Sequence, residues 1–169
     1  MLHQYFLEKK IKDLVIVSPD VGGLKMAYAY SNMLNAGLAI VAKRRKSATE
    51  VDALNLIGEV KDANVILVDD LTETAGTLVS ASTFLKDAGA RNVYAVVSHA
   101  VLGEMAVDRL KKSAIKELVT TDTVPHSKIK GFTRVILTVA PLLGEAIRRI
   151  HSNSSVTSLF EINGQKLSH

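Results

Sequence analysis

One segment of the chain, residues 65–77, reads Val65-Ile66-Leu67-Val68-Asp69-Asp70-Leu71-Thr72-Glu73-Thr74-Ala75-Gly76-Thr77. Its four leading apolar residues predict a buried strand, and the Thr/Gly turn at its end predicts the start of a helix. Two carboxylates follow the strand, at the place where open α/β sheets bind their ligands. A helix N-terminus offers unpaired N–H groups and the positive end of a dipole to a phosphate. The segment therefore predicts an anion site at the carboxyl edge of a parallel sheet.

The side chains of this segment fit a phosphorylated sugar. Asp69 and Asp70 are adjacent, so they point to opposite sides of the strand end and can bind sugar hydroxyls or Mg²⁺-bound water. Gly76 allows the backbone to approach a ligand closely, and Thr74 and Thr77 add hydroxyl donors. The alternative interpretation is an ordinary strand of a doubly wound protein, ending in Asp before a Thr-capped helix.

Composition indicates a globular domain of ordinary size. The chain has 169 residues, of which 47% are hydrophobic and 22% charged, enough to bury a core. No apolar run approaches the roughly 20 residues of a membrane span, and the N-terminus lacks the apolar core of a signal peptide. The absence of cysteine excludes disulfides and thiolate metal sites, and fits a cytoplasmic protein.

The positive charge is concentrated in one run. The formal net charge is +4, and its largest local source is Lys43-Arg44-Arg45-Lys46. No aromatic residue interrupts that run, and only 5% of the chain is aromatic, which argues against nucleic-acid binding. Small phosphorylated ligands suit this charge better.

Short apolar runs alternate with helical patterns along the whole chain. We expect strands at 14–18, 38–42, 65–69, 93–97, 117–121 and 134–138, and helices at 24–35, 75–88, 103–113 and 141–151. This alternation is typical of βαβ units. It predicts an α/β fold in which a mostly parallel sheet is flanked by helices on both faces.

The remaining segments complete this outline. Gly37 is the expected C-cap of the helix at 24–35. The polar segment 43–58 is expected to be a loop, and 155–160 to add a short strand. No repeat or composition change divides the chain, so residues 1–162 are predicted to form one domain and 163–169 a frayed tail.

Two further motifs fall at the same sheet edge. In Ser18-Pro19-Asp20-Val21-Gly22-Gly23, the paired glycines permit a turn with φ > 0 and leave room for a ligand. Asp20 would face the same sheet edge as Asp69 and Asp70, and three carboxylates at one edge repel one another unless a cation or sugar hydroxyls lie among them. The alternative role for Asp20 is a helix cap.

The basic run directly follows the second expected strand, so it also starts at this edge. Lys/Arg groups stabilise the charge that spreads over phosphoryl oxygens during transfer, and a mobile basic loop could close over nucleotide phosphates. A solvated surface loop is the alternative.

Taken together, residues 5 to about 162 resemble ribose-phosphate pyrophosphokinases. The resemblance rests on Ser-Pro-Asp-x-Gly-Gly, then Lys-Arg-Arg, then residues 65–77, in that order. Residues 65–77 resemble the phosphoribosyl-pyrophosphate loop that the family shares with type I phosphoribosyltransferases. Further matches are Gly58-Glu59-Val60-Lys61-Asp62, Thr121-Asp122-Thr123-Val124-Pro125 and Glu145-Ala146-Ile147-Arg148-Arg149-Ile150-His151. The implied fold is type I phosphoribosyltransferase-like.

The resemblance implies a reaction and a set of site residues. Members of the family transfer the diphosphoryl group of ATP to the 1-hydroxyl of ribose 5-phosphate, with Mg²⁺. By position, Asp20 resembles a metal ligand, and Lys43 and Arg45 resemble catalytic cations. The implied substrate-binding set is Asp69, Asp70, Glu73, Thr74, Ala75, Gly76 and Thr77.

The chain departs from the family in three ways. Most relatives carry Asp where this chain has Glu73. His99 stands in Ser-His-Ala rather than Thr-His-Gly, and is interpreted as a core or subunit-contact histidine rather than a ligand. Only the family's second half is matched, which implies a homo-oligomer or pairing with a first-half domain. Two alternatives remain open: a non-catalytic sugar-phosphate-binding or regulatory subunit, and a small type I phosphoribosyltransferase.

Overall fold

The computed structural model describes residues 1–44, 53–126, 128–162 and 165–166. It contains two compact units, Met1–Leu137 and Thr138–His169, which are described separately. The extent of the predicted single domain, 1–162, stays a prediction.

The first unit is built on one seven-stranded sheet with the order β3-β2-β1-β4-β5-β6-β7. All neighbouring strands are parallel except β2 and β3, which are antiparallel. The strands are β1 (Leu14–Ser18), β2 (Gly37–Arg44), β3 (Ala53–Ile57), β4 (Asn64–Thr72), β5 (Asn92–Ala100), β6 (Ile115–Thr121) and β7 (Arg134–Leu137). The predicted α/β fold with a mostly parallel sheet is confirmed.

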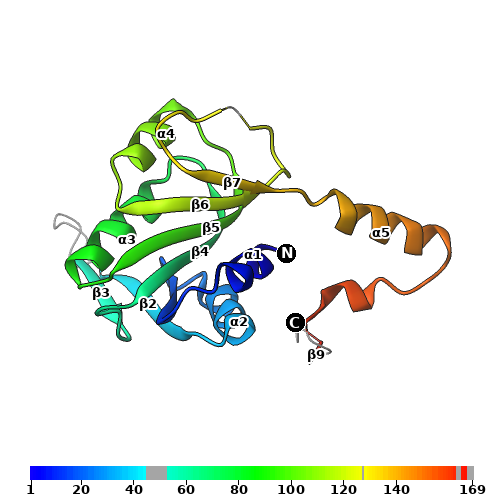
Figure 1. Cartoon of the computed structure of the whole chain (residues 1–169), viewed down its shortest axis with the longest axis horizontal. Helices are drawn as coiled ribbons and strands as arrows, with labels where there is room; N and C mark the ends of the chain where they lie inside the picture. The colour runs from blue at the N-terminus through cyan, green and yellow to red at the C-terminus, as the bar shows by residue number, and fades with distance from the viewer. Residues whose placement is uncertain (45–52, 127, 163–164, 167–169) are drawn as a thin grey trace. The chain divides into compact units, whose positions relative to one another are not determined.

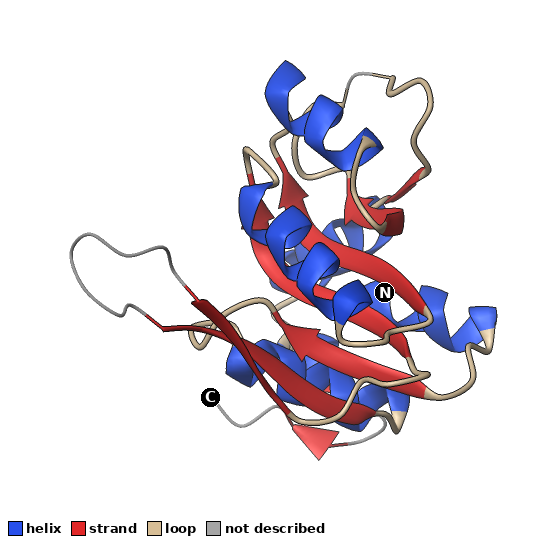
Figure 2. Cartoon of the chain, turned by 90° about the vertical axis from the view of Figure 1, so that its left-hand side faces the viewer, coloured by secondary structure: helices blue, strands red, loops and turns tan. Residues whose placement is uncertain are grey.

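Helices cover both faces of this sheet (Figures 1 and 2). They are α1 (Leu2–Lys9), α2 (Leu24–Leu34), α3 (Gly76–Asp87) and α4 (Glu104–Lys111). Buried residues of α3 and α4 belong to one hydrophobic cluster, and those of α1 and α2 belong to another. Strand residues alternate between the two clusters, as the pleat requires, so the sheet is buried on both sides.

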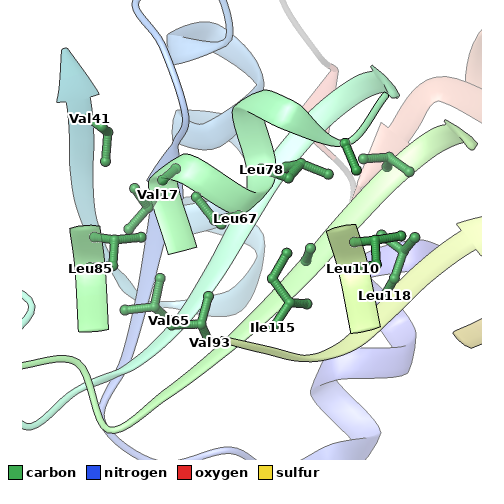
Figure 3. Packing of buried hydrophobic residues seen from close by; sticks show 14 of the residues in the cluster. Val17, Val41, Val65, Leu67, Leu78, Leu85, Val93, Leu110, Ile115 and Leu118 are labelled. Carbon is green, nitrogen blue, oxygen red and sulfur yellow. The ribbon is translucent and has the colours of Figure 1, made fainter. Parts of the chain in front are cut away.

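The cluster beneath α3 and α4 fixes the helix that starts at the candidate site. Leu78 and Leu85 of α3 and Leu110 of α4 have no exposed surface. Figure 3 shows the two α3 leucines near the strand side chains Leu67 and Val65, and Leu110 beside Leu118 of β6. Burying each such side chain stabilises the fold by about 1.5–3 kcal/mol. The first turn of α3 is therefore held rigidly against β4.

The prediction of a loop over 43–58 is wrong at both ends. The strand β2 continues to Arg44, and β3 pairs with it, with Lys43 opposite Leu54. The alternation Ala53-Leu54-Asn55-Leu56-Ile57 explains the strand, because Leu54 and Leu56 pack against the core while Ile57 is exposed. Residues 45–52 lie outside the described residues.

The prediction that Gly37 is the C-cap of α2 is wrong. The left-handed C-cap is Asn35, with φ 47° and ψ 51°, and Gly37 is the first residue of β2. Asparagine tolerates this conformation better than most residues with a side chain. A Cβ on Gly37 would approach the Val15 side chain to 3.3 Å, so the glycine relieves crowding between strands.

The second unit contains α5 (Ala140–His151), a 3-10 helix η1 (Thr157–Phe160) and the antiparallel pair β8 (Glu161–Ile162) and β9 (Gln165–Lys166). The expected strand at 155–160 is therefore wrong. The Ser155 hydroxyl accepts from the Thr157 N–H at 3.1 Å, a local bond that starts the 3-10 turn. Most of the expected tail, residues 163–164 and 167–169, lies outside the described residues. Of the helices in the described ranges, none has the length and apolarity needed to cross a bilayer.

A buried ion pair joins α1 to the sheet. The Glu117 side chain is 10% exposed and accepts from Lys9 Nζ at 2.5 and 2.6 Å and from the Tyr5 hydroxyl at 2.9 Å. Burial alone would lower the pKa of Lys9, but the hydrogen bond to Glu117 leaves it raised. The charge of Glu117 is thus satisfied only while α1 is docked.

We expect Lys9→Met to lower the free energy of unfolding by about 2 kcal/mol, because Glu117 would keep its charge in a buried place with one partner fewer. The matched control is Arg91→Met. Arg91 pairs with Asp13 at 3.2 Å, but both side chains are at least half exposed, so its loss should cost below about 1 kcal/mol. Urea unfolding of both variants gives the comparison. Equal losses would mean that the Lys9 pair behaves as a surface pair.

Candidate functional site

The candidate site lies at the carboxyl edge of the sheet, where β1 and β4 are neighbours. The two strands are parallel and pair Val17 with Leu67, so β1 ends beside Val68 while β4 continues to Thr72. Asp20 follows β1, and Asp69 and Asp70 lie near the carboxyl end of β4. Burial raises the pKa of Asp69, and the negative charge of the nearby Asp20 adds to this shift. The structure therefore brings together the carboxylates that the sequence predicted to share this edge.

The turn that carries Asp20 is tightly folded. The Ser18 hydroxyl donates to the Asp20 carbonyl at 2.6 Å, and the Gly23 N–H donates to Asp20 Oδ1 at 3.0 Å. The expected positive φ is wrong for this pair of glycines, and Gly23 has φ −80°. Crowding explains the residue instead, because a Cβ on Gly23 would lie 2.8 Å from the Ser18 hydroxyl. Asp20 thus closes the turn before α2, near enough for its charge to act on Asp69.

Asp69 is the carboxyl group at this edge whose pKa is shifted. Burial raises the pKa of this half-buried carboxyl to about 6. The Asp70 N–H opposes the shift by donating to Asp69 Oδ1 at 3.0 Å, whereas the negative charges of Asp20 and Asp70 add to it. A ligand that brings hydroxyl donors or a cation here would favour the ionised form.

The raised pKa of Asp69 predicts a pH-dependent stability. The folded chain holds this proton more tightly than the unfolded chain, where the pKa of Asp is about 3.9. The stabilisation is therefore present below about pH 4 and is lost as the pH rises through about 6. We expect Asp69→Asn to raise the melting temperature at pH 7.5 and to change it little at pH 4. The gain should stay below about 1 kcal/mol because water screens a half-exposed group.

Thermal unfolding at both pH values, without ligand, tests this expectation. The control is Asp108→Asn on α4, an exposed carboxylate 3.9 Å from Lys111. A melting-temperature difference between wild type and Asp69→Asn that is the same at pH 4 and pH 7.5 would contradict the assignment.

The Thr/Gly turn leads from β4 directly into α3. Ala75 precedes the helix in the left-handed conformation, with φ 56° and ψ 10°, and is 1% exposed. Glu73 and Thr74 are exposed, whereas Gly76 and Thr77 are partly buried. The N-cap residue Ala75 makes no side-chain cap, the Thr74 hydroxyl accepts a long hydrogen bond from the Gly76 N–H at 3.4 Å, and no acidic residue lies in the first turn of this described helix. The positive end of α3 is thus open to an anion.

One residue that contacts this turn was not predicted from the sequence. Arg109 of α4 donates through Nη1 to the carbonyl oxygen of Thr74 at 3.1 Å. An arginine on an exposed helix face carries no local signal for such a contact, since the two residues are 35 positions apart.

The predicted catalytic cations are placed only in part. Lys43 lies near the end of β2, three residues after Ile40, which pairs with Ser18. At about 3.3 Å per residue, the Lys43 backbone lies about 10 Å along the strand from the level of Ser18. Figure 2 shows β2 and β3 extending together from the sheet. Arg45 lies outside the described residues.

The carboxylates at this edge fit a partly hydrated Mg²⁺. Among the described residues, no group of three or more His, Asp or Glu side chains could hold a metal ion. Mg²⁺ usually keeps several waters and binds one or two protein carboxylates together with phosphates of a ligand. The charge that Asp20 and Asp70 impose on Asp69 is one that a cation here would neutralise.

His99 does not behave as a core residue. Its side chain is exposed, and Nδ1 lies 2.7 Å from the Thr123 hydroxyl. The core interpretation is wrong, because His99 pairs with Leu71 in the β4–β5 ladder but its side chain is exposed. The subunit-contact interpretation stays a prediction.

Comparisons with known proteins add an independent line of evidence. The family model described as phosphoribosyl synthetase-associated domain matches residues 45–161. A ribose-phosphate pyrophosphokinase of Gloeobacter violaceus is 48% identical over 162 residues, which are 95% of this chain and 49% of that protein. One from Caldanaerobacter subterraneus is also 48% identical, over 95% of this chain and 51% of its own.

A solved structure agrees with these matches. The crystal structure of phosphoribosylpyrophosphate synthetase from Mycobacterium smegmatis has a TM-score of 0.83 and 33% sequence identity, covering 90% of this chain and 50% of that one. The chain therefore spans about half the length of the relatives it matches.

Proposed function

The chain belongs to the phosphoribosyl synthetase-associated domain family, and from this premise we propose that it forms the sugar-phosphate-binding half of a ribose-phosphate pyrophosphokinase. The reaction moves the diphosphoryl group of ATP to the 1-hydroxyl of ribose 5-phosphate and leaves AMP. The relatives that carry this name are about twice as long. We therefore propose that the chain acts in a homo-oligomer or with a first-half domain.

The observation that carries the proposal is the carboxyl edge of β4. An aspartate pair, a left-handed turn and an uncapped helix start follow one another within residues 69–77. Carboxylates accept hydrogen bonds from sugar hydroxyls, and the amides of a helix start donate to phosphate. This spacing suits a sugar that carries hydroxyls at one end and a phosphate at the other.

Each residue of the site then has a proposed role. Asp69 and Asp70 bind the ribose hydroxyls, residues 74–77 bind the 5-phosphate, and Glu73 lies near the reacting sugar. Lys43 and Arg45 stabilise negative charge on the transferred group, since Lys/Arg clamps lower the free energy of phosphoryl transition states. Asp20 helps to hold Mg²⁺, which when bound would neutralise charge on the ATP phosphates.

A second candidate is a non-catalytic sugar-phosphate-binding or regulatory subunit. Glu73 favours it, because this exposed side chain is one methylene longer than the Asp that most relatives carry. A regulator would bind ribose 5-phosphate and form no AMP with any partner domain. A type I phosphoribosyltransferase would instead need a nucleobase and release diphosphate from the product sugar.

We expect Gly76→Val to abolish measurable binding of ribose 5-phosphate. A Cβ on Gly76 would lie 3.5 Å from both Arg109 Nη1 and the Thr74 hydroxyl, an ordinary contact. The branched methyls of valine would press on both groups and displace the turn. Gly76→Ala should therefore bind within about threefold of wild type.

Isothermal titration calorimetry with ribose 5-phosphate gives the comparison. The matched control is Gly103→Val at the start of α4, where a Cβ would meet no atom within 4 Å. Unchanged binding in Gly76→Val would remove the 5-phosphate from this turn. Absence of binding in wild type would contradict the proposed function itself.

A further inference from the structure

Arg109 approaches the phosphate turn from outside the segment that forms it. Its Nη1 donates to Thr74 O at 3.1 Å, and the same nitrogen would lie 3.5 Å from a Cβ on Gly76. Arg109 is thus the contact that connects α4 to the turn preceding α3. The two helices also share the hydrophobic cluster that contains Leu78 and Leu110, so the distance between them is fixed by packing.

The hydrogen bond from Arg109 is made to the residue directly before Ala75, which has a left-handed backbone conformation. Ala75 has φ 56°, a conformation in which a residue with a Cβ is disfavoured relative to glycine. Its methyl is buried in the cluster beneath α3, which holds the side chain in place. The carbonyl on its N-terminal side is the one that Arg109 binds. The buried methyl and the hydrogen bond from Arg109 therefore both stabilise the left-handed conformation of Ala75.

The hydrogen bond from Arg109 to Thr74 O also sets the direction of the Ala75 N–H, because both groups belong to one planar peptide. The Thr74–Ala75 peptide is trans, because no cis bond occurs among the described residues. In a trans peptide the C=O and N–H point in opposite directions. Because Thr74 O points to Arg109, the Ala75 N–H points away from that guanidinium. Loss of Arg109 would free this peptide to rotate.

The charge of Arg109 is unusual for its position. It lies beside the positive end of α3, where a cation is unfavourable and an anion is favourable. Within the described ranges, Arg109 forms an ion pair with no carboxylate. A phosphate bound at the start of α3 would relieve this repulsion.

We infer that Arg109 is a positioning residue of the phosphate site, which holds the Thr74–Ala75 peptide so that the Ala75 N–H faces the phosphate; this rests on the function proposed above. It acts through the turn and is not itself a catalytic group. Because a single N–H···O bond carries the effect, a lysine ammonium can replace the guanidinium in part.

The test compares Arg109→Met, Arg109→Lys and wild type in calorimetric titrations with ribose 5-phosphate. Arg109→Met should weaken binding about tenfold to thirtyfold, as expected for a lost charge-assisted hydrogen bond. Arg109→Lys should recover to within about threefold of wild type. The matched control is Lys111→Met, which removes an equal charge from the same helix and should change binding less than about twofold. Thermal unfolding checks that each variant is folded.

A second readout does not depend on affinity. In amide NMR spectra without ligand, the Ala75 and Gly76 resonances should move in Arg109→Met and stay unchanged in Lys111→Met. Equal binding by Arg109→Met and wild type, or equal losses in Arg109→Met and Lys111→Met, would overturn the inference. If wild type binds no ribose 5-phosphate, the proposed function fails. In that case the spectra without ligand test the positioning role by themselves, and identical Ala75 resonances in Arg109→Met and wild type would overturn it.

Discussion

Purified alone, these 169 residues should form AMP from ATP and ribose 5-phosphate at least about a thousandfold more slowly than the same chain mixed with a first-half domain. The reason is positioning, which supplies about 7–11 kcal/mol of the barrier in well-oriented reactions. ATP must be held with its β-phosphorus in line with the sugar hydroxyl. The described residues include the proposed sugar-phosphate site, but among them no group of three or more His, Cys, Asp or Glu side chains could hold a metal ion.

The matching domain is available from a relative. The half of the Gloeobacter violaceus protein that this chain does not match, expressed separately, would serve as the partner, because the matched halves are 48% identical. A coupled assay for AMP, with Mg²⁺, would compare the chain alone, the partner alone and the mixture. The full-length relative is the positive control.

Each outcome separates the candidate functions. Turnover in the mixture at about 1–10³ s⁻¹, the range typical of enzymes, would support a catalytic half. Ribose 5-phosphate binding with no AMP in any mixture would favour the regulatory subunit. The same turnover by the chain alone would contradict the prediction, and an oligomer of this chain would then have to provide the nucleotide site.

The sheet could be predicted because its signals are local. The segment Val65–Val68 is a run of apolar residues that favour strands, and the Thr/Gly turn predicts a helix from residue 75, where α3 begins at Gly76. The strand β3 was missed because its two inward residues, Leu54 and Leu56, lie within a polar segment. Their partners in β2 become neighbours only when the hairpin forms.

The sequence predicted which residues lie at the carboxyl edge of the sheet, and it did not predict the conformation of the turn before α3. The carboxylates Asp20 and Asp69 meet because parallel strands end at a common edge, which follows from the fold class. The left-handed residue of the turn is Ala75, although a glycine follows it. That choice depends on the buried methyl and on Arg109, which are tertiary contacts. No local sequence pattern encodes such contacts, so the sequence could not reveal the role of Arg109.

In the active mixture of chain and first-half domain, Lys43→Ala should lower kcat by about 10²–10³-fold and change the Kd for ribose 5-phosphate by less than about threefold. Preorganised cations near a developing charge stabilise the transition state more than the ground state, with losses of this size when one group is removed. The Lys43 backbone is held in the β2–β3 ladder opposite Leu54. An alanine there keeps the strand pairing, so the sugar site at β4 should be unaffected.

Steady-state kinetics and calorimetry on one preparation separate the two effects. The matched control is Lys46→Ala, which removes the same charge from the same basic run and has no role in the proposed chemistry. We expect it to reduce kcat less than about fivefold.

If Lys43→Ala raised the Kd for ribose 5-phosphate by the same factor as it lowered kcat, Lys43 would be a substrate anchor. A group that binds substrate and transition state equally raises KM without lowering kcat, whereas one that acts only in the transition state lowers kcat at unchanged Kd. The ratio of the two losses, rather than either loss alone, therefore decides whether the β2–β3 hairpin takes part in phosphoryl transfer.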